Sequence, residues 1–286
     1  MKAMDIITSK DNATVKNVKK LLEKASERRK QDVFVAEGVK MCDEAVSMGR
    51  VKTLLVSESF YDKCSGEFLY GGSESALIAE KGTHITELIR NGSKNVVRLS
   101  DGVMRLLSDT VNPQGVMALV HMPHSDVTER PFLENAFKRD GYIKLLVLDD
   151  VADPGNLGTM MRTAEAAGMT GVIMSRGCVD IFNPKTVRST MGSILRVPFT
   201  YVEKLSDTVQ MLKDSGIMFY VTHLRGEKYF NEMEYDKKCA VVIGNEARGV
   251  SSEISEICDN WVKIPMHGSV ESLNAAIAAA LMMYAL

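Results

Sequence analysis

An almost continuous apolar run at residues 143–148 (Ile-Lys-Leu-Leu-Val-Leu) constrains the fold of this chain more than any other feature. Such a run is typical of a strand that is buried on both faces of a parallel sheet. From there to residue 286, short apolar segments alternate with segments of helical spacing. The alternation predicts an α/β domain in which helices cover both faces of a parallel sheet.

The elements of this domain are outlined by the same alternation. Its strands are expected at residues 143–148, 171–174, 218–222, 240–243 and 261–264. Its helices are expected at residues 156–167, 183–191, 204–215, 251–258 and 272–286.

The first half of the chain has the pattern of a smaller α/β unit. Apolar positions three and four residues apart predict an amphipathic helix from residue 11 to about residue 30. Strands are expected at residues 33–36, 51–56, 96–99 and 116–121. Because 286 residues exceed a typical single domain, we expect two domains, at residues 1–121 and 141–286. A polar linker with a short helix at residues 132–138 would join them over residues 122–140.

Several function classes are disfavoured by composition. The N-terminus lacks the apolar core of a signal peptide, and the longest apolar run, residues 275–286, is shorter than the roughly 18 residues of a membrane span. We therefore expect a cytoplasmic protein without a membrane partner. The five scattered cysteines fit a reducing compartment. No metal is expected, because Pro123 breaks any helix that could align His121 with His124.

Charge is unevenly distributed, although the net charge is only −2. Residues 1–30 carry nine lysines and arginines against four acidic residues. Such a cluster is either a solvated helix face or an arm that contacts phosphates. Charge alone leaves both readings open.

Ligands of open parallel sheets bind beyond the carboxyl ends of the strands. This rule directs attention to the loops after Leu148, Ile243 and Ile264. The first runs from Asp153 through two glycines into a helix, whose N-terminus favours an anion. Within that helix, Arg162 is either a packed functional residue or the partner of Glu165 in a surface ion pair.

The second and third loops also combine glycines with polar side chains. In the second, Gly244 allows a ligand to approach the backbone closely, and Glu246 is either a site residue or the partner of Arg248 in a surface pair. In the third, Ser272 and Asn274 are either site residues or N-caps of the last helix. The fingerprints G-x-G-x-x-G, G-x-x-x-x-G-K-[ST] and G-x-S-x-G are absent from the sequence.

Three motifs coincide with these loops. They are Asn-x-Gly-x-x-x-Arg-Thr-Ala at residues 156–164, Ile-Gly-Asn-Glu-x-x-Gly at residues 243–249, and Ile-Pro-Met-x-Gly-x-x-x-Ser-Leu-Asn at residues 264–274. In this order they resemble the signature motifs of the SpoU (TrmH) family of RNA 2′-O-ribose methyltransferases, in the SPOUT superfamily. The resemblance is close over residues 140–286. Residues 33–38 and 113–116 resemble, more loosely, a ribosomal-protein-like substrate-binding domain.

Two positions depart from the family pattern. Ala247 replaces a frequent glycine, and Thr159 replaces a frequent alanine. Ala247 fits provided that its backbone is not left-handed. Thr159 puts the packing of the first loop in doubt.

The resemblance implies a fold, a cofactor and an assembly. The C-terminal parallel-sheet domain would contain a trefoil knot, which is an exception to the rule against knots. The cofactor S-adenosylmethionine would bind in this knot, against Gly244, Ile264, Met266 and Leu273. Members of the family are usually homodimers, and the helix at residues 275–286 could contribute to the interface. No metal is implied.

The resemblance also implies roles in transfer of a methyl group to a ribose 2′-hydroxyl. The proton of this poor nucleophile must be removed. Arg162 would act as a base or, because arginine normally stays protonated, as a clamp for an RNA phosphate. Asn156, Glu246, Ser272 and Asn274 would position Arg162, the substrate and the cofactor.

The substrate implied by the resemblance is a structured RNA, selected by the N-terminal domain. Ribosomal RNA, most of all 23S rRNA, is favoured over tRNA because the N-terminal domain resembles a ribosomal RNA-binding fold. The alternatives are a tRNA ribose methyltransferase, a base methyltransferase on the same scaffold, and a non-catalytic RNA-binding protein.

Overall fold

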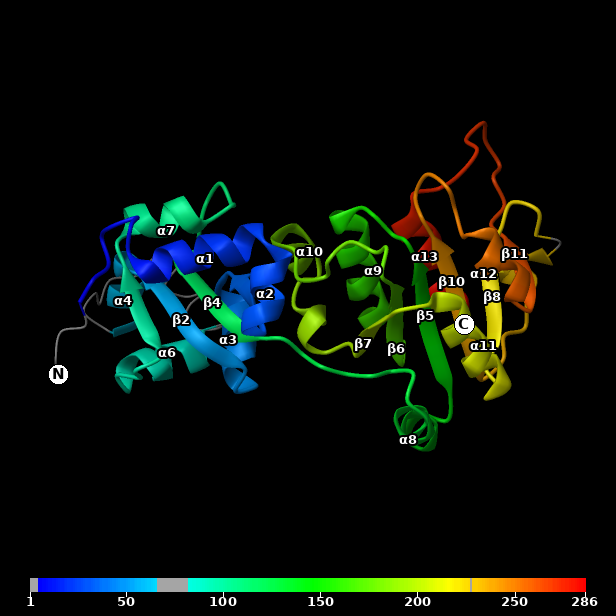
Figure 1. Ribbon diagram of the computed structural model, residues 1–286, viewed down its shortest axis with the longest axis horizontal. Coiled ribbons are helices and arrows are strands. Elements are labelled where there is room, and N and C mark those ends of the chain that lie inside the picture. Colours follow the sequence, from blue (N-terminus) through cyan, green and yellow to red (C-terminus); the bar gives the residue numbers. More distant parts are fainter. Residues whose placement is uncertain (1–4, 66–81, 227) are drawn as a thin grey trace. The chain divides into compact units, whose positions relative to one another are not determined.

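The computed structural model describes residues 5–65, 82–226 and 228–286. It divides into two compact units (Figure 1). Unit 1 comprises Met1–Met122 with Phe182–Pro184, and unit 2 comprises Pro123–Ile181 with Lys185–Leu286.

Unit 1 is built on a mixed four-stranded sheet with the strand order β1-β4-β2-β3. Strand β4 is antiparallel to β1 and β2, whereas β2 and β3 are parallel. The carboxyl ends of β1, β2 and β3 therefore lie at one edge of the sheet. The strands are β1 (Val33–Glu37), β2 (Val51–Ser57), β3 (Val96–Leu99) and β4 (Val116–His121). The helices are α1 (Ala13–Glu23), α2 (Ala25–Gln31), α3 (Val39–Ser47), α4 (Glu58–Ser65), α6 (Thr83–Arg90) and α7 (Asp101–Leu107).

The four strands expected in the first half of the chain are confirmed, each within one residue of its expected bounds. Helices α1 and α7 bury apolar side chains against one face of the sheet, as Val18 and Leu107 illustrate. Helices α3 and α4 contact β4 and β2, and α6 packs on both helices.

The single helix expected from residue 11 to about residue 30 is wrong. The backbone of Lys24 is extended and separates α1 from α2. The break allows Arg28 to turn back, so that its guanidinium donates hydrogen bonds to the carbonyl oxygens of Leu21 (2.6 Å) and Leu22 (3.2 Å) at the end of α1. Arg28 is only 3% exposed. It therefore stabilises the helix end and is not available to an RNA phosphate.

Unit 2 contains a seven-stranded sheet with the order β7-β6-β5-β10-β8-β11-β9, and all of its pairs are parallel. The predicted parallel sheet is thus confirmed. The strands are β5 (Ile143–Asp149), β6 (Gly171–Ser175), β7 (Phe199–Val202), β8 (Met218–Thr222), β9 (Lys228–Tyr229), β10 (Lys238–Gly244) and β11 (Asn260–Lys263). The helices are α8 (Arg130–Asp140), α9 (Pro154–Ala166), α10 (Pro184–Ser189), α11 (Leu205–Asp214), α12 (Ser252–Ile257) and α13 (Ala275–Ala285), with short 3₁₀ turns η1 (Ser193–Leu195) and η2 (Phe230–Glu232).

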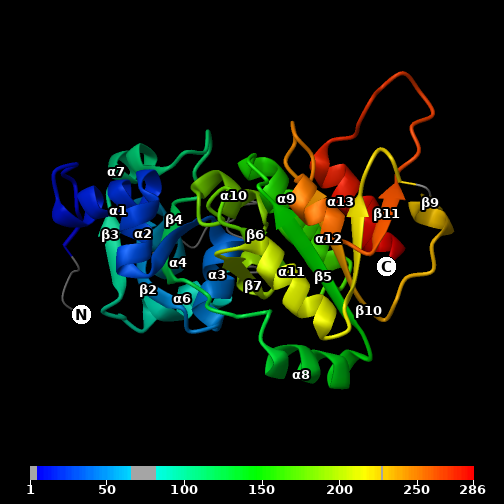
Figure 2. The same ribbon diagram turned by 45° about the vertical axis from the view of Figure 1, so that its right-hand side comes forward.

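Strand β10 lies between β5 and β8, although four strands separate it from β5 along the chain (Figure 2). Helices α9 and α13 pack on each other, and α13 contacts β10. Helices α8, α11 and α12 contribute Leu133, Val209 and Ile254 to a core that also contains inward-facing residues of β5, β8 and β10. The sheet is thus enclosed, and its loops carry the polar residues.

Two details of unit 2 differ from the expectations. The last helix begins at Ala275 rather than at Ser272, because the Asn274 side chain caps its first amides. Strands β7 and β9 were not expected. The trefoil knot and the domain boundaries stay predictions, and α8 lies within the expected linker.

No helix among the described residues is long and apolar enough to cross a membrane. Over the same residues, no three His, Cys, Asp or Glu side chains come together in a way that could hold a metal ion.

Candidate active site

The loops after β8, β10 and β11 surround a cavity of about 340 Å³ at the carboxyl edge of the unit 2 sheet. All four residues predicted to bind the cofactor line this cavity, and so do Glu246 and Ser272. The cavity is lined by Gly244, Glu246, Ile264, Met266, Ser272 and Leu273. The structure therefore brings the second and third predicted loops together in one pocket.

Glycine is required at position 244 because the backbone of residues 249–250 passes very close to it. A Cβ added at this position would overlap the carbonyl carbon of Gly249 and the amide nitrogen of Val250. The loop closes through two backbone hydrogen bonds between Asn245 and Gly249, of 3.0 and 2.8 Å. Ala247 is not left-handed, so the departure from glycine there is tolerated.

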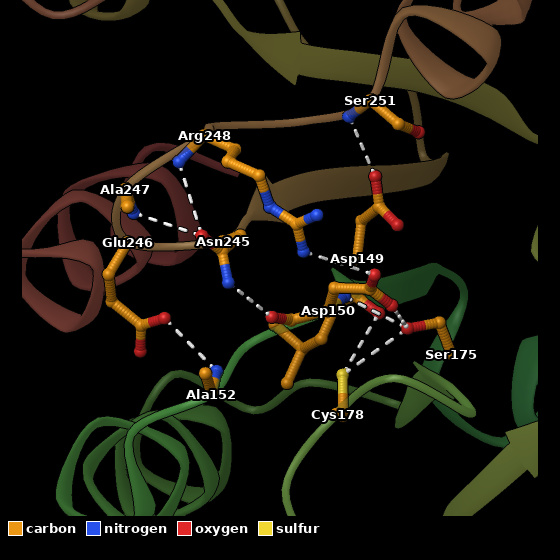
Figure 3. A network of polar contacts seen from close by, with 11 residues as sticks. Asp149, Asp150, Ala152, Ser175, Cys178, Asn245, Glu246, Ala247, Arg248 and Ser251 are labelled. Atoms are coloured by element: carbon orange, nitrogen blue, oxygen red, sulfur yellow. Dashed lines mark hydrogen bonds and ion pairs between the residues drawn. The ribbon is translucent and has the colours of Figure 1, made fainter.

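The side chain of Asn245 holds the loop from inside. Its Oδ1 accepts hydrogen bonds from the amides of Ala247 (3.0 Å) and Arg248 (3.1 Å). Its Nδ2 donates to the carbonyl oxygen of Asp150 at 2.8 Å, which ties the loop after β10 to the loop after β5. Figure 3 shows this link between the two loops.

Glu246 strengthens the same link. Its carboxylate accepts hydrogen bonds from the amides of Ala152 (3.0 Å) and Asp153 (3.0 Å) and from Nδ2 of Asn156 (2.9 Å). Partial burial acts to raise the pKa of Glu246, but these hydrogen bonds outweigh it and hold the pKa below the usual carboxyl value. The surface pair with Arg248 is wrong, because Arg248 lies 3.5 Å from Asp150 instead.

Asn156 extends this chain of contacts to the third loop. Its Oδ1 accepts a hydrogen bond from Nδ2 of Asn274 at 2.9 Å. Oδ1 of Asn274 in turn accepts from the amides of Ala276 and Ile277, so Asn274 is both an N-cap and a member of the site. Glu246, Asn156 and Asn274, one residue from each of the three predicted motifs, thus form one hydrogen-bonded series.

Asp149, the last residue of β5, and Asp150, which follows it, support the segment after β10, and no sequence motif indicated their role (Figure 3). Asp149 accepts a hydrogen bond from the amide of Ser251 at 2.8 Å. Asp150 is left-handed, with φ of 57°, and its carboxylate accepts a hydrogen bond from Ser175 at 2.7 Å. Their partners lie far away in sequence, so only the fold reveals them.

Arg162 lies on the exposed side of α9 and does not line the cavity. The expectation of a packed environment is therefore wrong for its side chain. The ion pair with Glu165 is also wrong, because Glu165 pairs with Arg196 and accepts a hydrogen bond from Ser193 (2.5 Å). Among the described residues, Arg162 has no hydrogen-bond or ion-pair partner.

Sequence reasoning also missed the loop after β8. Thr222, His223 and Leu224 line the cavity beside Gly244. Burial lowers the pKa of His223, and the positive charge of Arg225 adds to the effect. The rule for parallel sheets could have found this loop, since it too follows the carboxyl end of a strand.

Comparisons with known proteins show the family of this chain. The family model described as SpoU rRNA Methylase matches residues 144–284, and an MRM3-like substrate binding domain matches residues 12–118. The chain is also 34% identical, over 98% of its length and 98% of the relative, to the 23S rRNA (guanosine(2553)-2′-O)-methyltransferase RlmP of Bacillus subtilis.

The chain belongs to the SpoU rRNA methylase family. Solved structures of this family have the same fold over nearly the whole chain. The AdoMet-bound rRNA methyltransferase of Sinorhizobium meliloti is 26% identical with a TM-score of 0.78, and covers 98% of this chain and 96% of its own. The SpoU methyltransferase AviRb of Streptomyces viridochromogenes is 28% identical with a TM-score of 0.74, at 96% coverage of both chains. The chain is thus an S-adenosylmethionine-dependent RNA 2′-O-methyltransferase of the SpoU family.

The cavity suits S-adenosylmethionine. Its volume lies within the roughly 300–1,000 Å³ of small-ligand sites. Ile264, Met266 and Leu273 offer an apolar surface to an adenine ring, and the absence of a side chain at Gly244 exposes backbone groups. Glu246 and Glu271 also line the cavity, and their carboxylates complement the positive charges of the cofactor.

Proposed function

We propose that this SpoU methyltransferase modifies a ribose 2′-hydroxyl in 23S ribosomal RNA. The similarity to the Bacillus subtilis 23S rRNA enzyme supports this target, because it extends over both units and not over the catalytic unit alone. We also propose that the enzyme acts in the cytoplasm, where a ribosomal substrate would be available.

The hydrogen-bonded series Glu246–Asn156–Asn274 is the structural observation that supports ribose methylation at this site. It joins the cavity wall to helix α9, which also carries Arg162. Hydrogen bonds fix the rotamers of all three side chains, and a site whose groups are held in advance loses little free energy in ordering during the reaction. In our proposal these residues orient the substrate ribose and the start of α9.

Arg162 binds an RNA phosphate in this proposal and does not remove the proton. Arginine keeps its own proton in proteins. Arg162 is exposed and has no partner among the described residues, so its guanidinium is available for two parallel hydrogen bonds to a phosphate. Such a clamp brings the 2′-hydroxyl into line for attack. Ser272, which is exposed at the cavity, hydrogen-bonds the ribose or the cofactor.

The cofactor supplies an electrophilic methyl group on a sulfonium when it is bound. Gly244, Ile264, Met266 and Leu273 hold it through apolar contact and backbone hydrogen bonds, as the family resemblance implies. When the 2′-oxygen bonds to the methyl carbon, the carbon–sulfur bond breaks and leaves a neutral thioether, and the hydroxyl proton passes to solvent water.

The enzyme acts as a homodimer in our proposal, with α13 at the interface. Ile277 and Tyr284 are seven residues apart on one side of α13 and are 51% and 68% exposed. A second copy of the chain would cover this apolar side. Light scattering should give twice the mass of the chain, and Tyr284→Glu should shift the protein to monomers. A monomeric wild-type protein would contradict the assembly.

The test of function is transfer of labelled methyl from S-adenosylmethionine to unmodified 23S rRNA. Arg162→Ala should lower kcat by about 100-fold, as expected when reacting groups lose their alignment. Arg130→Ala is the matched control, since Arg130 is an exposed helical arginine of unit 2 whose surface pair with Glu134 contributes little.

Digestion of the labelled RNA distinguishes the alternatives. A 2′-O-methylnucleoside from rRNA supports the proposal. Label on a base, or label on tRNA alone, would contradict it, and so would full activity of Arg162→Ala.

A further inference from the structure

Unit 1 has a cavity of about 520 Å³ at the edge of its sheet, well within the size range of ligand sites. It lies where β1, β2 and β3 end, and its walls come from the segments that follow these strands and from residues 112–115 before β4. The methyl-transfer site accounts for none of these residues.

Two glycines shape this cavity. Gly115 has φ of +79°, and an added Cβ would lie 2.6 Å from Oγ of Ser57. Gly38 has φ of +98°, and its Cβ would lie 3.0 Å from Oε1 of Gln114. The same oxygen accepts a hydrogen bond from the amide of Val39 at 2.8 Å. Both glycines belong to the segments that resemble a ribosomal-protein-like domain. In the structure, residues 113–115 form part of the cavity wall, and Gly38 lies against one of them, Gln114.

Side chains at the mouth of the cavity have hydrogen-bonding groups that are not used within the described part of the chain. Asn112 is exposed and makes no hydrogen bond with the described residues, and the amide nitrogen of Gln114 likewise lacks a partner there. Arg105 is exposed and makes only a long bond, from Nε to the carbonyl oxygen of Asp101 at 3.4 Å. The carboxylate of Asp101 is engaged by the hydroxyl of Ser59 at 2.6 Å.

The floor of the cavity is apolar. Val39, Phe60 and Met104 line it and are at most 3% exposed. Lys63 and Arg105 provide positive charge at its walls against the single carboxylate of Asp101. An apolar floor, amide groups at the rim and an arginine plane suit a flat, polar-edged ring attached to a phosphate.

An unpaired nucleotide of RNA has this chemistry. Sequence-specific recognition of RNA uses bases that are splayed out of a loop or bulge, stacked on an aromatic or guanidinium plane and hydrogen-bonded along their edges. The match of residues 12–118 to a substrate binding domain points to an RNA ligand for the unit that contains the cavity.

We propose that this cavity holds one extruded base of the RNA substrate. Arg105 stacks on the base, Asn112 and Gln114 bond its edge, and Lys63 contacts the adjoining phosphate. The inference rests on the proposed function, because it names the part of unit 1 that recognises the same RNA.

The test is the double variant Asn112→Ala/Arg105→Ala in the full-length enzyme, with unmodified 23S rRNA as the methyl acceptor. We expect KM for rRNA to rise at least about tenfold, with kcat within twofold of wild type. Lys52→Ala is the matched control, because Lys52 is an exposed cation at the opposite end of β2. Its KM should stay within twofold. Thermal unfolding and S-adenosylmethionine affinity should be equal in all three proteins.

Arg105→Lys tests the base contact itself. Lysine keeps the positive charge of Arg105 but lacks its planar guanidinium group, which stacks on the base in our proposal. KM for rRNA should therefore be at least about fivefold above that of wild type. Recovery to the wild-type KM would mean that Arg105 contacts a phosphate, and would overturn the assignment of a base. An unchanged KM in the double variant, with an active wild-type enzyme, would overturn the cavity as a binding site. A wild-type enzyme that methylates no 23S rRNA would instead refute the proposed function.

Discussion

The loop after β10 and the segment after β11 line the same cavity, but they are held in different ways. Asn245 and Glu246 tie the first loop to residues 150–156 through hydrogen bonds. In contrast, residues 264–273 make no hydrogen bond with any described part of the chain, and residues 267–272 are exposed. Only Asn274, at the end of the segment, is anchored.

This difference separates two tasks within one pocket. The loop after β10, here called the bonded wall, is preorganised, so it can hold α9 and its side of the cofactor without a cost in ordering. The segment after β11, here called the open wall, contributes Ile264, Met266 and Leu273 to the proposed cofactor site and can adjust as the cofactor and an RNA strand enter, at the cost of ordering on binding. Substitutions in the two walls should therefore have unequal effects.

The largest effect is expected from glycine substitutions that compare the two walls. Gly244→Ala would force apart the backbone at residues 249–250, and should lower the free energy of unfolding by about 3 kcal/mol and weaken cofactor binding at least about tenfold. Gly268→Ala is the control, since its Cβ would meet nothing within 4 Å. Urea unfolding and calorimetric titration with S-adenosylmethionine measure both effects. Equal losses in the two variants would refute the comparison.

A smaller effect is expected from polar truncations. Asn245→Ala removes three hydrogen bonds and should cost about 2 kcal/mol of stability. Ser272→Ala removes a side chain without a partner among the described residues, and should change stability by less than about 0.5 kcal/mol. The two unfolding midpoints provide the measurement. A Ser272→Ala midpoint that falls as far as that of Asn245→Ala would show that the third loop is also bonded.

The smallest effect is a pH dependence that belongs to the bonded wall alone. Because the folded-state pKa of Glu246 lies below its ordinary value of 4.5, its ionised form stabilises the fold above that pH. This stability is lost as the pH falls through the lower, folded-state pKa. The melting temperature of wild type should exceed that of Glu246→Gln at pH 7, and the gap should close below pH 4.5. A gap independent of pH would contradict the role of the carboxylate.

The sequence predicted the pocket because its residues lie in motifs that follow strands. Gly244, Ile264, Met266 and Leu273 each belong to a loop whose position the apolar runs determine. The carboxyl-edge rule then places these loops together without knowledge of any contact.

Partners that lie far apart in the chain could not be predicted in this way. Glu246 has a near neighbour of opposite charge, Arg248, yet it binds the amides of Ala152 and Asp153, more than 90 residues away. Glu165 likewise selects Arg196 over Arg162. Local spacing overestimates surface pairs, because such pairs contribute little and are displaced by backbone amides that need acceptors.

The break between α1 and α2 illustrates a different limit. The apolar spacing of residues 11–30 suits one helix, and no glycine or proline interrupts it. Arg28 is buried against the end of α1, and this contact favours two helices over one. The spacing of apolar residues does not reveal that a charged side chain will be buried.

The position of β10 has a consequence for how the enzyme is made. Among the described strands, β8 pairs only with β10 and β11, so nothing joins it to β5 until β10 has been synthesised. Lys238 of β10 pairs with Ile143, and closing so long a loop slows folding. Strands β5, β6 and β7 can pair earlier, but the complete sheet and its cavity can form only after β10 has been made, late in translation. A chain cut short before β10 would be an inert fragment, so partly made protein cannot methylate RNA at the wrong time.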